Sequence, residues 1–352
     1  PSASYTAQQP RPRARRRPTE LAATTLDAKA VKGAPLDIGV EEPARSIDVY
    51  ATLPPVDIRL LDEQEHDDLP GRTHVINLAK GPPCPDPFAL VKSELIPFSD
   101  NMKLLVASEN PILSQAASHF FEKRHGKRFR PTIVMLLAQA LENVHKDADD
   151  VVFERQTRLG QVTEMIHVAS LIHDDVLDDA DTRRGGDAIH KMYSNKVAVL
   201  SGDYLLARAS VLLAKLGHMD VVQVMARALD SLVSGEIMQI KTGEEDLLDM
   251  MTYLRKSYHK TASLICDASR SCALLAGHAS DSEVAAAAEE YGYHLGLAFQ
   301  IVDDVLDFAM DDDQLGKPAG ADLSLGLATA PILFAAQDHP ELRPLIERRF
   351  KG

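Results

Sequence analysis

From residue 87 onward, apolar side chains recur at every third or fourth position, which is the period of an amphipathic helix. No segment of the sequence shows the sustained alternation with β-branched residues that is typical of half-buried strands. Gly217 and Gly277 stand where the periodic stretches stop. The pattern predicts an all-α fold with at least eight helices, over residues 112–123, 132–142, 151–178, 196–216, 220–241, 246–277, 281–310 and 323–337.

The first 86 residues follow another pattern. Residues 1–19 are rich in Arg, Ser and Pro and contain no acidic residue, a composition that resembles the remnant of an organelle transit segment; the alternative is a solvated disordered tail. Residues 20–86 are acidic and interrupted by prolines. We therefore expect residues 1–86 to be a disordered or extended leader, residues 87–352 to form the helical domain, and the location to be mitochondrial.

The charge balance limits the kinds of partner. The chain has 38 Lys and Arg against 52 Asp and Glu, a net charge of −14, and aromatic residues make up only 5%. These values argue against a nucleic-acid binder. An acidic protein that acts on an anionic substrate has to recruit metal cations.

Two further classes are disfavoured. The longest apolar stretch, residues 197–216, is interrupted by Asp203, Arg208 and Lys215, so we expect no membrane-spanning segment. The three cysteines form no Cys-x-x-Cys pair, which argues against structural zinc and suits a reducing compartment. Cys266 and Cys272 lie in an apolar helical pattern and are expected to be buried thiols.

One acidic motif occurs twice. Asp-Asp-Val-Leu-Asp spans residues 174–178 and again residues 303–307, each time after an apolar helical run. Residues four apart share a helix face, so Asp174 and Asp178 project together, as do Asp303 and Asp307. Like charges at this spacing repel, and negative charge is unfavourable at a helix C-terminus.

A bound cation would relieve that repulsion, and carboxylate oxygens together with substrate phosphates are typical Mg²⁺ ligands. The alternative for one such motif is a solvated acidic helix end, but the second copy favours a metal site. A calcium loop beginning at Asp179 is excluded, because Arg183 and Arg184 would occupy the positions that need an oxygen ligand and a glycine.

Basic residues that suit a diphosphate occur at three places. Arg183 and Arg184 follow the first acidic motif. Lys127 and Arg130 precede Pro131, which fits the first turn of a helix, so they are expected on a loop at a helix N-terminus. Lys260 and Thr261 interrupt another helix. His167 lies seven residues before Asp174 and therefore shares the face of the acids, where it can donate to a phosphate, although a core histidine is the alternative.

Taken together, these residues resemble the trans-isoprenyl diphosphate synthase family, over the chain from about residue 87 onward. The ordered set includes Gly-Lys-x-x-Arg-Pro at 126–131, both acidic motifs, the Arg pair at 183–184, Gly202-Asp203, Lys260-Thr261, Gln300 and Gly316-Lys317. The resemblance implies an isoprenoid-synthase-type helical bundle around a central cavity. It also implies an enzyme that repeatedly condenses isopentenyl diphosphate with an allylic diphosphate (farnesyl or geranylgeranyl) into a long all-trans chain, for the ubiquinone side chain.

The resemblance also implies roles for individual residues. About three Mg²⁺ ions on the allylic diphosphate are held by Asp174, Asp178 and Asp303, with Asp175, Asp304 and Asp307 in support. The same diphosphate is held by Arg183, Lys260, Gln300 and Lys317, and isopentenyl diphosphate by Lys127, Arg130, His167 and Arg184. Thr261 and Gln300 border the developing carbocation with their oxygens.

Product length is expected to depend on the residues before the first acidic motif. Ser170 lies four residues before Asp174 and about 40° from its face, and Ala169, which the family treats as the tunnel floor, lies roughly 140° away. Both side chains are small, so an open floor and a long product are expected. The family continues with further helices beyond the position of Gly352, which implies a C-terminally incomplete domain.

The resemblance further implies a homodimer, or a heteromer with a related subunit, and peripheral membrane association for product release. Two alternatives remain. One is a non-catalytic partner subunit of a heteromeric synthase, although such subunits tend to lose the acids or the Arg pair, which are intact here. The other is a class I terpene cyclase or head-to-head synthase, which needs no isopentenyl diphosphate site.

Overall fold

The computed structural model describes residues 85–122, 128–141, 143–144, 149–183, 186–241, 243, 246–309 and 320–351. Its helices are α1 (Pro87–Leu90), α2 (Lys92–Val106), α3 (Pro111–Glu122), α4 (Phe129–Ala140), α5 (Asp149–Leu177), α6 (Ile189–Met192), α7 (Asn195–Lys215), α8 (Met219–Lys241), α9 (Met250–Ser257), the π-helix η4 (Tyr258–Ala262), α10 (Ser263–Leu275), α11 (Glu283–Ala309), α13 (Ala321–Ser324), α14 (Ala330–Asp338), the 3₁₀-helix η5 (Pro340–Leu342) and α15 (Arg343–Glu347). The predicted all-α class is confirmed. The part of the chain described here adds one small hairpin, in which β1 (Thr182–Arg183) pairs antiparallel with β2 (Gly186–Asp187). Of the expected leader, residues 1–86, the part over 1–84 lies outside the described residues.

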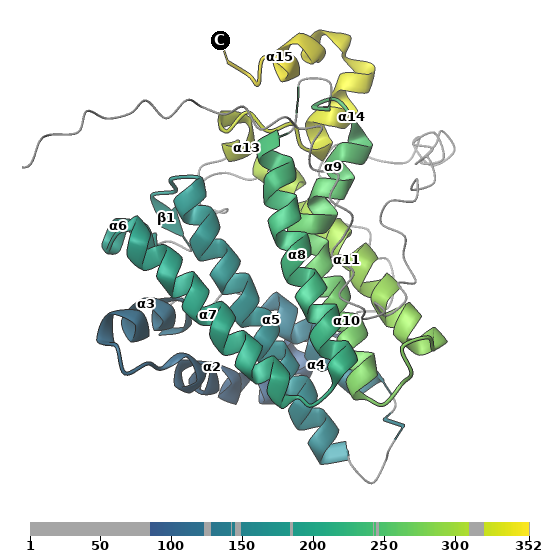
Figure 1. Cartoon of the computed structure of the whole chain (residues 1–352). Coiled ribbons are helices and arrows are strands. Elements are labelled where there is room, and N and C mark those ends of the chain that lie inside the picture. Colours follow the sequence, from purple (N-terminus) through teal and green to yellow (C-terminus); the bar gives the residue numbers. More distant parts are fainter. Residues whose placement is uncertain are drawn as a thin grey trace, which may run out of the picture. The chain divides into compact units, whose positions relative to one another are not determined.

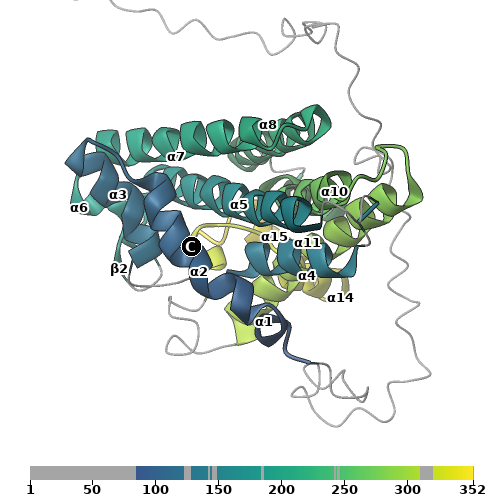
Figure 2. The ribbon, with the colours of Figure 1, turned by 90° about the horizontal axis from the view of Figure 1, so that it is seen from below.

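The bundle is built on two central helices. The long helix α5 packs against α7 on one side and α4 on the other, and α10 packs against α8, α11 and α5 (Figures 1 and 2). The main core gathers buried side chains from these helices, among them Leu159, Ile166 and Leu264. A smaller apolar cluster, which includes Leu254, Leu333 and Ile346, joins α9 to α14 and α15. The C-terminal ends of α5 and α11 point toward the same end of the bundle in Figure 1.

Helix α7 bears on the expectation that no segment spans a membrane. By length and composition alone it could cross a membrane. Its contacts are those of a bundle helix: the Tyr204 hydroxyl donates to the carbonyl of Ala107 (2.8 Å), and Arg208 Nε donates to the carbonyl of Leu105 (2.8 Å). The sequence contains charged residues in this stretch, but the other positions are so apolar that the helix still has the length and composition of a membrane span.

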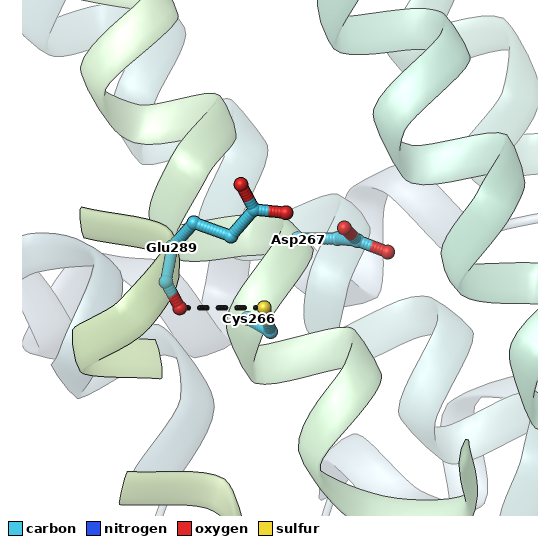
Figure 3. Close-up of side chains that lie close together, drawn as sticks. All are labelled: Cys266, Asp267 and Glu289. Atoms are coloured by element: carbon cyan, nitrogen blue, oxygen red, sulfur yellow. Dashed lines mark hydrogen bonds between the residues drawn. The ribbon is translucent and has the colours of Figure 1, made fainter. Parts of the chain in front are cut away.

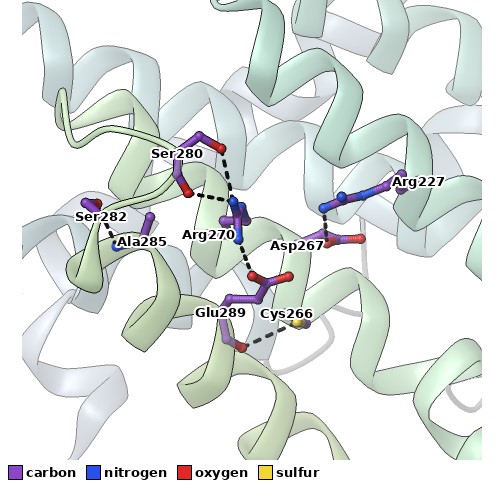
Figure 4. A network of polar contacts seen from close by, with 8 residues as sticks. All are labelled: Arg227, Cys266, Asp267, Arg270, Ser280, Ser282, Ala285 and Glu289. Carbon is purple, nitrogen blue, oxygen red and sulfur yellow. Dashed lines mark hydrogen bonds and ion pairs between the residues drawn. The ribbon is translucent and has the colours of Figure 1, made fainter. Parts of the chain in front are cut away.

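Buried ion pairs connect α8, α10 and α11. Arg270 pairs with Glu289 and also donates to Ser280, while Arg227 lies 3.6 Å from Asp267 (Figure 4). Cys266, Asp267 and Glu289 bring ligand atoms within 4.8 Å of one another (Figure 3), but both carboxylates already face a guanidinium. The Cys266 thiol donates to the backbone carbonyl of Glu289. This group therefore stabilises the helix packing and lacks the spare negative charge that would favour a cation.

Two glycines allow helices to approach each other closely. A Cβ atom on Gly296 of α11 would lie 2.5 Å from the Cα of Ala262, and one on Gly235 of α8 would lie 2.7 Å from Lys260 Cγ. Both partners belong to η4, where the helix widens into a π-helix at Lys260 and Thr261, the position at which the sequence predicted an interruption. The absence of side chains at these two glycines thus brings α8 and α11 against the same short segment.

The Gly296→Ala variant tests this packing. The added methyl group would meet backbone that cannot move alone, so we expect the free energy of unfolding to fall by about 1–3 kcal/mol. Gly160→Ala in α5 is the matched control, because its Cβ would meet other atoms only at 3.7 Å or more. That control should leave stability unchanged or raise it by about 0.5–1 kcal/mol. Equal denaturant midpoints for the two variants would contradict the close-packing argument.

Candidate active site

The two acidic motifs lie at the C-terminal ends of long helices. Helix α5 ends at Leu177, and the amide of Asp178 still donates to the carbonyl of Asp174 (2.8 Å), so the helical turn carries Asp178 onto the face of Asp174 as predicted. In α11, Asp303 and Asp307 are separated by one helical turn. Both apolar helices thus bring carboxylates to the end of the bundle where the helix dipoles are negative.

The structure divides the six acids into two groups. Asp175, Asp304 and Asp307 are buried, with exposed fractions of 1%, 3% and 1%. Asp175 Oδ1 accepts from Arg183 Nε (2.7 Å) and forms an ion pair with Arg183 Nη2 at 2.5 Å. Asp307 Oδ2 accepts from the amide of Asp322 (3.3 Å). By contrast, no hydrogen bond or ion pair with another described residue engages the carboxylates of Asp174, Asp178 and Asp303.

The electrostatics around Asp174 favour a cation. The pKa of Asp174 is raised to about 7, first by burial and then by the nearby negative charges of Glu236 and Asp178, against the opposing positive charge of Lys260. Burial also raises the pKa of Asp175 and Asp304, although hydrogen bonds from their partners act in the opposite direction. In addition, Asp175 Oδ2 is buried with no hydrogen-bond partner among the described residues. An excess of carboxylate oxygens with too little nearby positive charge fits a site for a hard divalent cation.

The structure describes some of the predicted basic residues and leaves others out. Arg183 stands on β1 and pairs with Asp175, while Lys260 in η4 pairs with Glu236 and donates to Gln239 Oε1 (3.2 Å). His167 is half-buried on α5. Arg130 was expected on a loop but is the second residue of α4, because the left-handed Arg128 (φ 52°) starts the helix earlier. Lys127, Arg184 and Lys317 lie outside the described residues.

Thr261 and Gln300 meet as neighbours. The Thr261 hydroxyl donates to Gln300 Oε1 (2.6 Å), and Gln300 Nε2 donates in turn to Asp304 Oδ1 (2.7 Å). This chain of hydrogen bonds joins the π-helical break to the second acidic motif. The widened turn at η4 presents Lys260 and Thr261 at the level of these acids.

An apolar cavity of about 290 Å³ lies beside Asp174 and Lys260. Its walls come from α5 and α8 and from Lys260, and the apolar share of the lining is Leu177, Leu232, Val233, Ile237 and Ile240. Ser170 also lines this cavity, whereas Ala169 is fully buried and is not part of the lining. The site therefore combines charged groups for an anion and its metal with an adjoining space for a hydrocarbon chain.

Several residues of the site were missed in the sequence. Glu236 and Gln239 on α8 hold Lys260, and Tyr253 and Lys256 on α9 face Asp304. Glu236 is one of five charged residues in the helical stretch over 220–241, with Asp220, Arg227, Asp230 and Lys241, so its charge alone did not mark it as a site residue. Nothing in the spacing indicates which other helix it faces, since that depends on how α8 packs against η4.

Known proteins support the same family. A profile described as "Polyprenyl synthetase" matches residues 110–351. The chain is 47% identical to solanesyl-diphosphate synthase 1, mitochondrial, of Oryza sativa subsp. japonica, over 75% of this chain and 64% of that protein. It is 40% identical to the probable hexaprenyl pyrophosphate synthase, mitochondrial, of Neurospora crassa, over 79% and 72% of the two chains.

A solved structure agrees with these relatives. The polyprenyl synthase from Caulobacter crescentus, crystallised with calcium and isoprenyl diphosphate, is 32% identical and superposes with a TM-score of 0.67 over 76% of this chain and 79% of that one. The chain spans slightly less than two thirds of the length of the rice relative.

The raised pKa of Asp174 predicts a measurable effect on stability. A carboxyl whose pKa is higher in the folded than in the unfolded state stabilises the fold at low pH, and this contribution is lost as the pH rises from about 4 to about 7. Asp174→Asn removes the ionisable group, so at pH 8 we expect it to raise the free energy of unfolding of the metal-free protein by about 2 kcal/mol. At pH 4 the difference should be small.

Urea unfolding in EDTA at both pH values measures the effect. Asp230→Asn, which changes an exposed aspartate of α8, is the matched control and should have little effect at either pH. If Asp174→Asn is destabilising at pH 8, Asp174 is not under electrostatic strain in the metal-free protein.

Proposed function

The chain belongs to the polyprenyl synthetase family, and from this premise we propose that it is a Mg²⁺-dependent prenyltransferase. It condenses isopentenyl diphosphate repeatedly with an allylic diphosphate, farnesyl or geranylgeranyl, and makes a long-chain all-trans polyprenyl diphosphate. The observation that carries this proposal is the cavity in which Asp174 and Lys260 adjoin an apolar lining from α8. A substrate with a diphosphate head and a hydrocarbon tail matches both parts.

The metal ligands we propose are Asp174, Asp178 and Asp303, whose carboxylates are open, with Asp175, Asp304 and Asp307 holding the local structure. Bound Mg²⁺ supplies positive charge that stabilises the departing diphosphate. Arg183, Lys260, Gln300 and Lys317 would donate to the same diphosphate, and Lys127, Arg130, His167 and Arg184 would hold isopentenyl diphosphate.

The ion pairs of Arg183 and Lys260 would change when a diphosphate binds. Arg183 and Lys260 are held by Asp175 and Glu236, so both cations lie ready beside the site without being fixed there by a phosphate. Donation to a diphosphate would replace or share these ion pairs, and a doubly charged phosphate group offers stronger hydrogen bonds than a carboxylate. The oxygens of Thr261 and Gln300 would face the allylic carbon as positive charge develops there. The released diphosphate would take the proton.

The cellular role follows from the relatives. Two of the similar proteins are named as mitochondrial and as synthases of solanesyl and hexaprenyl chains. We propose the same location for this chain and the ubiquinone side chain as the use of its product. Exposed apolar side chains on α7 and α8, among them Leu200, Val211 and Met219, support association with a second copy or a related subunit. Peripheral contact with a membrane would release the product.

The activity is tested with labelled isopentenyl diphosphate, farnesyl diphosphate and Mg²⁺, with the products separated by reversed-phase chromatography. We expect polyprenyl diphosphates longer than geranylgeranyl, loss of product in EDTA, and a rate lowered by about 10²–10⁴-fold in Asp178→Ala or Asp303→Ala. Hydrocarbon made from the allylic diphosphate alone would instead identify a cyclase. Product that forms only after co-expression with a related subunit would identify a partner subunit.

Chain length gives a second test. Because Ser170 lines the cavity, Ser170→Phe should narrow it and shorten the products while leaving the first condensation intact. Ala169→Phe should shorten them as well if the growing chain passes that turn, at an additional overpacking cost of about 1–3 kcal/mol because Ala169 is fully buried. Val151→Phe, at an exposed position near the other end of α5, is the control. An unchanged product distribution in Ser170→Phe would show that the tail does not enter this cavity.

A further inference from the structure

A single tyrosine from α9 contacts the second acidic motif. The Tyr253 hydroxyl donates to Asp304 Oδ2 at 2.5 Å, and Gln300 Nε2 donates to Asp304 Oδ1 at 2.7 Å. Tyr253 and Asp304 are both nearly inaccessible, with exposed fractions of 4% and 3%. Each oxygen of Asp304 thus has a donor, and the two donors come from different helices.

A positive charge lies near this contact and compensates the negative charge of Asp304. Lys256, one turn after Tyr253, faces Asp304 with its positive charge, and its ammonium lies 5.8 Å from the centre of the Tyr253 ring. A buried carboxylate with two hydrogen bonds and a nearby cation is held in a fixed position. Asp304 therefore has the surroundings of an anchor, whereas Asp303, the preceding residue, is exposed.

The hydrogen bond between Tyr253 and Asp304 helps to fix the position of α11. Helix α11 contacts η4 through Thr261 and Gln300, and it contacts α9 through Tyr253 and Asp304. These two contacts lie one helical turn apart on α11 and fix both its rotation and its height at the level of Asp303 and Asp307. A rotation of the helix would move the Asp303 carboxylate away from a metal ion that it would hold together with Asp174 and Asp178.

We propose that Tyr253 is a positioning residue, which acts through Asp304 to hold Asp303 of α11 in the place where it would bind divalent metal. The proposal rests on the proposed function for its catalytic meaning. Its measurable consequence, however, is the affinity for metal, which can be determined without turnover. Removing the hydroxyl should allow α11 to shift, and the metal ions would then have to supply the free energy that restores the geometry.

Tyr253→Phe removes only the hydroxyl group. We expect about tenfold more Mg²⁺ to be needed for half-maximal turnover, because a hydrogen bond to a charged group is lost. Saturating Mg²⁺ should restore kcat, and KM for isopentenyl diphosphate should not change. Mg²⁺ with inorganic diphosphate should also raise the Tm of the protein. We expect the Mg²⁺ concentration at half of this rise to be higher in Tyr253→Phe by the same factor.

Tyr293→Phe is the matched control. Tyr293 is also a buried tyrosine and stands on α11 itself, roughly 16 Å along the helix from Asp304. It should leave the Mg²⁺ dependence unchanged even if it lowers Tm. The inference is overturned if the two variants have the same Mg²⁺ dependence, or if Tyr253→Phe loses kcat that saturating Mg²⁺ does not restore.

The thermal titration separates this inference from the proposed function. If the unaltered chain shows no turnover but binds Mg²⁺ with diphosphate, the proposed function fails while the titration of Tyr253→Phe still decides the role of Tyr253. An unaltered chain whose Tm does not respond to Mg²⁺ and diphosphate would overturn both.

If Tyr253→Phe does not fold, the same Mg²⁺ titration is carried out on Asp304→Asn. About tenfold weaker Mg²⁺ binding supports an anchor, and binding abolished even in excess Mg²⁺ means that Asp304 is itself a ligand.

Discussion

The central constraint in this structure is mutual repulsion among carboxylates that two apolar helices carry to one end of a bundle. Burial makes the negative charges of Asp174, Asp175 and Asp304 more costly. The helix dipoles add to the cost because both motifs lie at C-terminal ends. At Asp174 burial raises the pKa first, and the negative charges of Glu236 and Asp178 add to this effect, so that the pKa lies at about 7. The fold retains the acids by tying Asp175, Asp304 and Asp307 to donors while leaving Asp174, Asp178 and Asp303 open to a cation.

The positive groups of the site are restrained in a corresponding way. Arg183 is held by an acid of its own motif, and Lys260 by Glu236 of α8. These ion pairs keep the guanidinium and the ammonium near the place where a diphosphate would lie, and they reduce the entropy lost when it binds. A site with buried cations but no local acids would be harder to fold, and one with acids alone would repel its anionic substrate.

Close helix contacts make this arrangement possible. Gly235 and Gly296 allow α8 and α11 to approach the π-helix η4, which presents Lys260 and Thr261 between them. The cavity beside Asp174 runs along α5 and α8, so the same packing that sets the charges also leaves an apolar space for a hydrocarbon chain. In the proposed function, head-group chemistry and chain length would therefore both depend on neighbouring residues of the same two helices.

The amino-acid sequence by itself determined the helical class, the helix boundaries to within a few residues over most of the bundle, the repeated aspartates and the break at Lys260 and Thr261. These features depend on local period and spacing, which a helix of 3.6 residues per turn converts directly into faces. The sequence also indicated buried thiols at Cys266 and Cys272, and both are buried. Only the tertiary structure decided which acids of each motif are open, that Glu236 holds Lys260, and that Tyr253 anchors Asp304. These are contacts between helices that lie far apart in the chain. They depend on how the helices are rotated and how closely they pack, and the spacing of residues within one helix does not encode either property.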